Sequence, residues 1–196
     1  MLCCKKKEPP KKVQVMALKA CCEGANIERL NERWEQFDDS LRHSVMTTKD
    51  AEGSLPYQLA ASKGQYRVLE WLLDHCKAID IEVDINKRDS KGRTPLLSCC
   101  ENMVAFDSST EAQTSTLFQC VKVLHRWGAD LDVEAEYVKM TPLHWAAYHD
   151  AHETVAYLLS NGARFGQDLG RSSAIDLAGM KGHARTMQEF YKFFET

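Results

Sequence analysis

The stretch TPLHWAAYHDAHETVAYLLSNGA, from Thr141 to Ala163, decides the fold of this chain. It opens with Thr141 and Pro142, a favoured start of a helix, because the hydroxyl can cap free amides and proline has no N–H to leave unpaired. Apolar residues then recur at helical spacing, a polar break follows at His149–Asp150, and a second apolar stripe leads to Gly162, a residue type that ends helices. The pattern predicts two short antiparallel helices. Such a pair is too small to bury its own apolar faces, so it needs copies of itself on either side.

The same stretch resembles an ankyrin repeat. It carries the T-P-L-H-x-A opening and the L-L-x-x-G-A ending of that family. It departs from the family pattern at the turn between the helices, where Asp150 replaces a glycine. Such a turn needs left-handed backbone, which aspartate tolerates less well than glycine. The resemblance implies an all-α fold, an ankyrin-repeat solenoid of helix-turn-helix units joined by hairpin-like loops.

Weaker copies of the pattern divide the rest of the chain. We expect a basic, cysteine-containing tail at residues 1–12 and an ankyrin-repeat domain at residues 13–196, with about five units at about 13–46, 50–84, 89–133, 136–167 and 168–196. The first unit lacks the TPLH opening, and the last carries Asp176 in place of the motif histidine, as expected of terminal units whose outer faces meet water. In the first unit, Val15, Leu18 and Cys22 predict one helix and Ile27, Leu30, Trp34 and Phe37 a second, with Trp34 and Phe37 in the core.

Two middle units are longer than the family period of about 33 residues. From Thr94 to Thr141 the chain advances 47 positions, so about 14 residues are extra, and we expect them between the two helices of the third unit, within Met103–Phe118. About six further residues are extra before that unit, within Lys77–Val83. Cys99 and Cys100 hold the positions of the motif alanines, which predicts small buried side chains.

Composition excludes several classes of protein. Eight cysteines include three adjacent pairs and lack the CxxC spacing of zinc sites, which favours reduced thiols in an intracellular protein. No apolar run approaches the ~18 residues of a membrane span. The net charge is −3 and the Lys and Arg residues outside the tail are dispersed, so we expect no nucleic-acid surface. No catalytic or nucleotide-binding motif is present, so we expect no enzyme activity and no cofactor. His144, His149 and His152 lie close in sequence, but His144 belongs to the repeat motif, and we expect no metal site.

The tail Met1–Lys12 carries five lysines and one glutamate. One interpretation is a solvated tail; the other is a membrane-surface signal, because Cys3 and Cys4 beside a lysine cluster could combine acyl chains with a basic patch for an anionic leaflet. Leu2 excludes N-myristoylation. We predict S-acylation, with palmitate, at Cys3 and Cys4, and a cytoplasmic protein peripheral at the inner face of a membrane.

The family resemblance also implies a protein-binding concave face, formed by the first helix of each unit and the hairpin tips. Trp145 and Tyr148 are the strongest candidates, because Trp and Tyr dominate binding hot spots. The alternative is that both rings pack on a neighbouring helix or on the long insertion. The predicted partner-binding residues are Leu59, Lys63, Arg88, Lys91, Arg93, Glu101, Trp145, Tyr148, His149 and Lys181.

The sequence thus predicts a non-enzymatic adaptor or scaffold that binds a protein through its concave face and is tethered to a membrane through its tail. Two other classes stay open: a regulatory or inhibitory subunit of a signalling enzyme, and a structural component of a cytoskeletal or axonemal assembly. An ankyrin-like fold does not separate these classes, because fold does not imply function. In the last unit, Met187, Phe190, Tyr191 and Phe194 form a stripe that we expect to cap the stack, with docking on a partner as the alternative.

Overall fold

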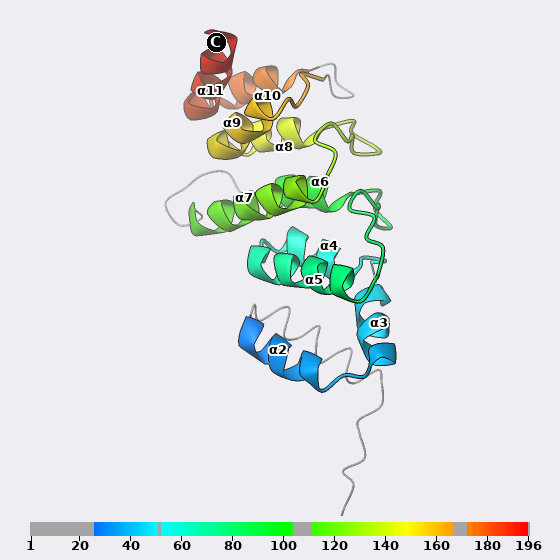
Figure 1. Cartoon of the computed structure of the whole chain (residues 1–196). Helices are drawn as coiled ribbons and strands as arrows, with labels where there is room; N and C mark the ends of the chain where they lie inside the picture. The colour runs from blue at the N-terminus through cyan, green and yellow to red at the C-terminus, as the bar shows by residue number, and fades with distance from the viewer. Residues whose placement is uncertain (1–25, 51, 104–110, 167–171, 196) are drawn as a thin grey trace, which may run out of the picture.

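The structure, a computed structural model, describes residues 26–50, 52–103, 111–166 and 172–195. All the regular elements in these ranges are helices (Figure 1). In chain order they are α2 (Ile27–Glu35), α3 (Asp39–Thr47), α4 (Pro56–Ser62), α5 (Tyr66–Ala78), α6 (Pro95–Glu101), α7 (Glu111–Arg126), α8 (Pro142–Tyr148), α9 (His152–Ser160), α10 (Ala174–Lys181) and α11 (Ala184–Glu195).

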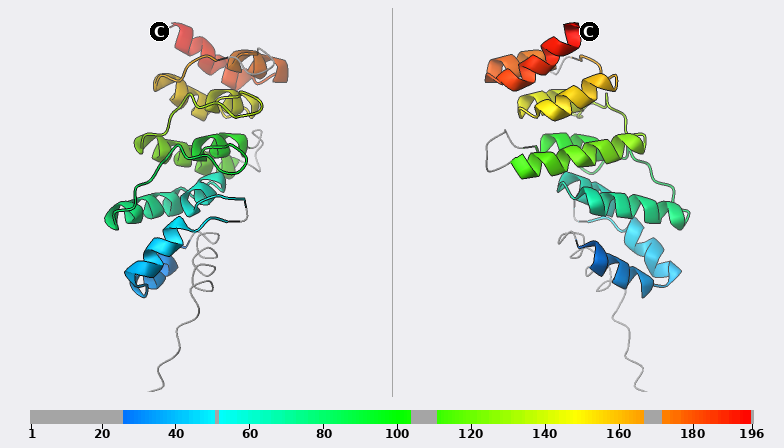
Figure 2. Two further views of the ribbon diagram at one scale, coloured as in Figure 1. Left: turned by 90° about the vertical axis from the view of Figure 1, so that its right-hand side faces the viewer. Right: turned by 60° about the vertical axis from the view of Figure 1, so that its left-hand side comes forward.

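From α4 onward the helices form two parallel rows. The first helices of the units, α4, α6, α8 and α10, pack on one another and make the inner row; the second helices, α5, α7, α9 and α11, make the outer row. Within a unit the two helices also pack together, so the units stack as successive layers (Figures 1 and 2). One continuous apolar core runs through the layers. The predicted all-α repeat fold is confirmed.

Each inner helix begins at a capped residue in extended backbone. In the third unit the Thr94 hydroxyl accepts a hydrogen bond from Leu97 N–H at 3.3 Å, and in the last unit Ser173 and Asp176 bond reciprocally. In the fourth unit Thr141 N–H donates to Nδ1 of the buried His144. These contacts satisfy amides that have no partner inside the helix, so the motif letters at these positions are helix caps.

The second unit starts differently, because Leu55 has no hydroxyl. Its backbone N–H instead donates to Gln58 Oε1 at 2.8 Å, and Gln58 Nε2 donates to the Lys87 carbonyl at 2.7 Å. Gln58 thus supplies the reciprocal half of a capping box and also ties α4 to the loop that closes the unit.

The turns between paired helices use left-handed backbone. Gly64 has φ +70°, and Asp150, the residue that departs from the family pattern, has φ +56°. An aspartate tolerates this conformation less well than glycine, but its carboxylate accepts a hydrogen bond from Thr186 Oγ1 at 2.8 Å. The hydrogen bond to the last unit therefore offsets part of the backbone strain at Asp150.

Neighbouring units are also joined at their hairpins. Asn86 Oδ1 accepts from Asp130 N–H at 2.9 Å, and Asp132 Oδ1 accepts from Arg164 N–H at 2.7 Å. Asn86 lies in the hairpin that follows α5. The backbone it bonds through Oδ1 belongs to the next unit, so the same sequence position is a link between layers.

The first unit contains a helix that we did not predict. We expected the unit's helices to end near Leu41, but after α2 the chain forms α3, which is steeply inclined to the stacked helices in Figure 1. Asp38 caps α3 by accepting from Leu41 N–H at 2.7 Å. The predicted helix with Val15, Leu18 and Cys22 lies outside the described residues.

The second helix of the first unit carries Ile27, Leu30 and Trp34 as predicted, but it ends before Phe37, and it docks on α5 through aromatic side chains. Trp34 and Phe37 are each 8% exposed, which confirms them as core residues. Trp34 meets Trp71 edge to face, with ring centroids 5.3 Å apart. Trp71 Nε1 donates to Asn31 Oδ1 at 2.7 Å, so the N–H group of this buried indole has a hydrogen-bond acceptor.

Some of the extra residues of the middle units lie in helices. We expected Met103–Phe118 to lie between α6 and α7, but helix α7 already begins at Glu111 and has 16 residues, against 9 in α9. The segment therefore supplies about two additional helical turns. Similarly, α5 has 13 residues, so part of the expected extra length before the third unit is one more turn of helix. Residues 104–110 lie outside the described residues.

The C-terminal aromatic stripe is divided between core and surface. Phe190 is fully buried and Met187 packs against the core, whereas Tyr191 and Phe194 are 54% and 60% exposed. Phe165, from the loop after α9, stacks on Phe194 with centroids 5.2 Å apart. Half of the predicted stripe closes the core, and the other half faces outward.

Candidate functional site

An aromatic cluster lies on the inner row, where α8 meets α10. It consists of Trp145, Tyr148 and His149, which follow one another within one turn of α8 and its C-cap, and of Lys181 at the end of α10. The Trp145 and His149 rings are stacked 5.9 Å apart, and Tyr148 stands edge-on to both, at 6.0 Å and 5.0 Å. All three rings are half-buried, and Trp145 packs against the core. The cluster is thus a fixed aromatic surface.

Cations border the aromatic cluster. Lys181 Nζ lies 4.2 Å from the centroid of the Tyr148 ring, within the range of a cation–π contact. The pKa of His149 is lowered from its ordinary value of 6.5, chiefly because burial disfavours the charged ring, with smaller contributions from His183 and Lys181. Near neutral pH the cluster therefore carries a lysine charge over neutral rings.

Arg93 and Glu101, two more predicted partner-binding residues, belong to a network of ion pairs beside α6. The Arg93 guanidinium bonds the Asp89 carboxylate through Nε and Nη2, at 3.0 Å and 2.8 Å, and its Nη1 lies 3.5 Å from Glu101 Oε2. Hydrogen bonds to the guanidinium hold the Asp89 pKa below its ordinary value, although burial acts in the opposite direction. Both of these hydrogen bonds go to Asp89 Oδ2, and hydrogen bonds between two charged groups are stronger than neutral ones. Arg93 is therefore engaged inside the chain.

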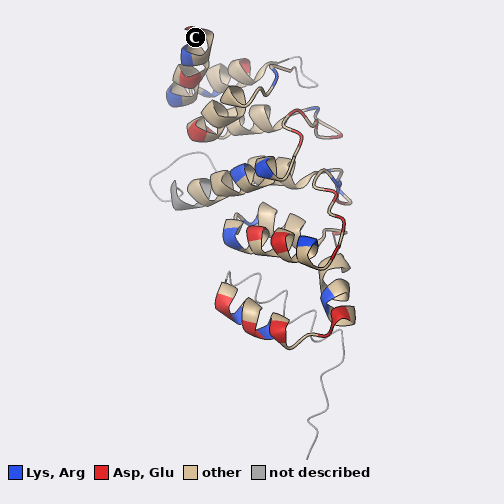
Figure 3. Ribbon diagram, in the orientation of Figure 1, with Lys and Arg blue, Asp and Glu red and all other residues tan. Residues whose placement is uncertain are grey.

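The two other predicted basic residues at the hairpin tips are also engaged. Lys91 pairs with Glu52 at 2.9 Å, across two units. Arg88 donates to the carbonyls of Gly92 and, at 3.0 Å, Glu134, which joins the tips of the third and fourth units. Figure 3 shows both signs of charge on these loops. The tips therefore form a rim of mixed charge, and its basic side chains Lys91 and Arg88 already contact groups of other units.

The remaining predicted partner-binding residues, Leu59 and Lys63, lie at the end of α4. Leu59 is half-buried and Lys63 is exposed. They share the inner row with Trp145, but two layers separate α4 from α10. The structure thus brings Trp145, Tyr148, His149 and Lys181 together in one cluster and places Leu59 and Lys63 elsewhere on the same row.

Sequence reasoning missed Tyr137, the most exposed aromatic residue in the described part of the chain. Tyr137 lies in the hairpin tip before α8 and is 76% exposed, and Val138 next to it is 41% exposed. Hydrogen bonds from Ala135 N–H to the Met140 carbonyl and from Lys139 N–H to the Ala135 carbonyl hold this tip. The available signal was an aromatic ring in the middle of the polar run Glu134–Lys139, where no core position is expected.

The described cysteines have the properties of buried structural thiols. Cys99 and Cys100 are fully buried, as predicted from their alanine positions, and Cys99 Sγ–H donates to the Ala61 carbonyl. Burial raises the pKa of Cys76 to about 11 and that of Cys100 to about 12. These thiols stay protonated, which makes them poor nucleophiles and poor metal ligands.

The described residues lack two kinds of feature. They contain no group of three or more His, Cys, Asp or Glu side chains placed to hold a metal ion. Among them, no helix has the length and apolar character that crossing a bilayer requires. The predicted acylation sites Cys3 and Cys4, and the whole tail 1–12, lie outside the described residues.

Comparison with known proteins agrees with this architecture. A search of the curated proteins found no match. Residues 110–192 match the family model described as ankyrin repeats (3 copies), and the same paired-helix layers continue through α4 to α7. Residues 110–192 therefore consist of ankyrin repeats, which generally mediate protein–protein interaction and are typically not enzymes.

Proposed function

We propose that the protein is a non-enzymatic adaptor that binds a protein partner through its inner-row face, with the aromatic cluster of Trp145, Tyr148, His149 and Lys181 at the centre of the contact. The observation that carries the proposal is the geometry of this cluster. Three rings and one lysine from two adjacent units meet on one face, and each ring is half-buried.

The packing of the cluster favours binding. Trp145 is held by stacking on His149 and by the edge of Tyr148, so its rotamer is already fixed before a partner arrives. Fixing a side chain in advance reduces the entropy that association costs. The half of each ring that remains accessible can be covered by a partner, and rigid aromatic residues of this kind dominate binding hot spots.

The charged rim has a second role in the proposal. The hairpin tips are joined by the hydrogen bond from Arg88 to the Glu134 carbonyl, and they present both signs of charge in fixed positions. Fixed charges at the edge of an interface select partner orientation and association rate more than affinity. We therefore assign affinity to the aromatic cluster and orientation to the rim.

The variant Trp145→Ala/Tyr148→Ala should lose its main partner. Truncating hot-spot residues costs ~2 kcal/mol or more each, so enrichment of the partner in proximity labelling in cells should fall at least about tenfold. Because both rings are half-buried, some thermal stability should be lost as well, but the helical circular dichroism spectrum should remain.

Two further variants make this test specific. Tyr191→Ala removes an exposed aromatic ring from the outer row and should leave the labelled proteins unchanged. Lys181→Glu changes only an exposed charge beside Tyr148 and should weaken labelling without loss of fold. If all three variants label the same proteins as the unaltered chain, the aromatic cluster is not the binding site.

We further propose that Cys3 and Cys4 are S-acylated and that the lysines beside them hold the protein at an anionic membrane surface. Support comes from the residue types alone: two thiols and five lysines within twelve residues. One acyl chain gives marginal attachment, and a second chain or a basic patch is needed for stable attachment.

Metabolic labelling with an alkynyl palmitate analogue should therefore mark the unaltered chain, and Cys3→Ser/Cys4→Ser should abolish the signal. The double variant should also move from the membrane fraction to the supernatant. The buried thiols Cys99 and Cys100 are internal controls, because Cys99→Ala should leave labelling unchanged. Equal labelling of the double variant and the unaltered chain would reject the tether.

A further inference from the structure

The connection after α5 differs from its counterparts after α7 and α9. Asp80, with φ +57°, takes the left-handed position that Gly128 and Gly162 hold in those units. Ile81 N–H donates to the Cys76 carbonyl at 2.9 Å, as Ala129 N–H donates to Leu124. The helix ends are thus equivalent. However, the turn that leads into the hairpin begins at Asp84, four residues after Asp80, whereas in the next unit it begins two residues after Gly128.

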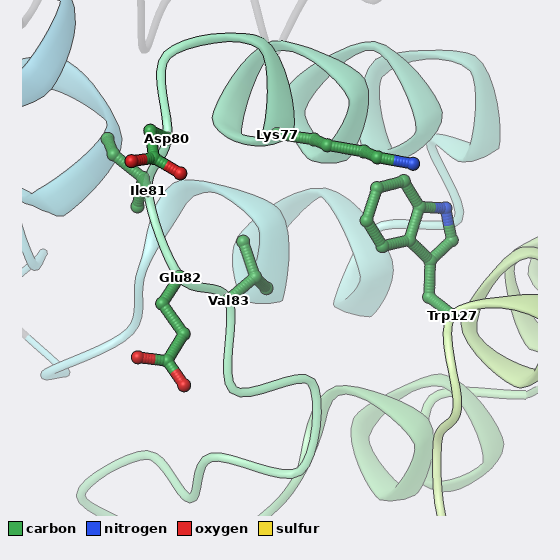
Figure 4. A pocket seen from close by; sticks show the side chains of 6 residues that line it. All are labelled: Lys77, Asp80, Ile81, Glu82, Val83 and Trp127. Carbon is green, nitrogen blue, oxygen red and sulfur yellow. The ribbon is translucent and has the colours of Figure 1, made fainter.

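These extra residues form one wall of a pocket between the ends of α5 and α7. The pocket has a volume of about 570 Å³ and is lined by Lys77, Asp80, Ile81, Glu82, Val83 and Trp127 (Figure 4). It lies against the outer row, whereas the aromatic cluster lies on the inner row. The inserted residues therefore line a pocket that lies outside the proposed partner contact.

The two sides of the pocket differ in chemistry. In Figure 4 Lys77 extends along the Trp127 ring, and its Nζ lies at the same end as the indole nitrogen, whereas Asp80 and Glu82 lie on the opposite side, with Val83 between. Ile81, Val83 and Trp127 are half-buried, and the two acidic residues are exposed. Within the described residues, the carboxylates of Asp80 and Glu82 have no ion-pair or hydrogen-bond partner.

We propose that this pocket binds a segment of a partner protein that carries one arginine next to an apolar residue. The arginine would enter from the acidic side, where its guanidinium would pair with the Asp80 or the Glu82 carboxylate. The neighbouring apolar side chain would cover Val83 and the free face of Trp127. Lys77 stands at the far end of the pocket and repels a second basic residue, so the site selects an isolated arginine over a run of basic residues.

The proposal can be tested by NMR on the full chain with two probes, acetyl-Leu-Arg-Leu-amide and acetyl-Leu-Glu-Leu-amide. The indole Nε1–H signal of Trp127 is assigned by its absence in Trp127→Phe. The arginine peptide should move this signal in a saturable way and leave the Trp145 signal in place, and the glutamate peptide should not move it. Asp80→Asn/Glu82→Gln should weaken the arginine peptide about tenfold, the loss expected for a charge-assisted hydrogen bond.

Lys77→Gln is the matched control, because it removes a charge from the same pocket without touching the carboxylates. It should leave binding of the arginine peptide unchanged or tighter. Three results would each overturn the proposal: an equal response to both peptides, no saturable change at Trp127, or undiminished binding by Asp80→Asn/Glu82→Gln. None of these results bears on the aromatic cluster, because Trp145 reports on that site separately.

Discussion

Replacing Phe190 with alanine should lower the free energy of unfolding by about 3–5 kcal/mol, the range for phenylalanine truncation in a packed core. Phe190 is fully buried in α11, and Phe165 lies against it with ring centroids 5.9 Å apart. Urea unfolding followed by circular dichroism measures the loss.

Phe194→Ala is the control for this prediction. Phe194 lies four residues further along the same helix, stacks on the same Phe165 ring, and is 60% exposed. Its truncation should cost about 1 kcal/mol or less. Equal losses for the two variants would show that the outer half of the stripe closes the stack as firmly as the buried half.

Gly64→Ala should lower the free energy of unfolding by about 2–4 kcal/mol, for two separate reasons. At φ +70° any residue with a Cβ atom is strained, by about 1–2 kcal/mol. In addition, that Cβ would lie 2.9 Å from Thr116 Oγ1 and 3.2 Å from Leu117 Cγ in α7. Overpacking of this kind adds about 1–3 kcal/mol, so urea unfolding should show a clearly shifted midpoint.

Gly162→Ala separates the two reasons. Gly162 has φ +86°, but a Cβ there would meet no atom within 4 Å. Only the backbone term remains, so the loss should be about 1–2 kcal/mol. If Gly64→Ala costs no more than Gly162→Ala, α7 does not press on the turn as closely as the structure shows.

The sequence predicts the repeated part of the fold well. The TPLH motif and its variants mark the starts of α6, α8 and α10, because capping depends on residues three positions apart and is visible locally. The burial of Cys99 and Cys100 is also predictable from their alanine positions, because close packing between layers requires small side chains at fixed spacing. Of the predicted site residues, the spacing of Trp145, Tyr148 and His149 on one helix places them in one cluster.

Other features depend on contacts between distant residues. The basic residues Arg88, Lys91 and Arg93 are predicted to bind a partner, but Glu52 and the Glu134 carbonyl, 39 and 46 residues away, engage Lys91 and Arg88. The extension of α7 could not be predicted from the sequence for a related reason. Its Ser- and Thr-rich residues favour a loop locally, and the helix is stabilised by packing on its neighbours.

The links through Asn86 and Asp132 also affect how this molecule can change over generations. Each one reaches only the adjoining layer, and it does so through main-chain amides, which every residue except proline possesses. A gene duplication or deletion that respects these joints leaves these hairpin links intact. The length of the array is therefore open to natural selection independently of the surface that any single layer displays.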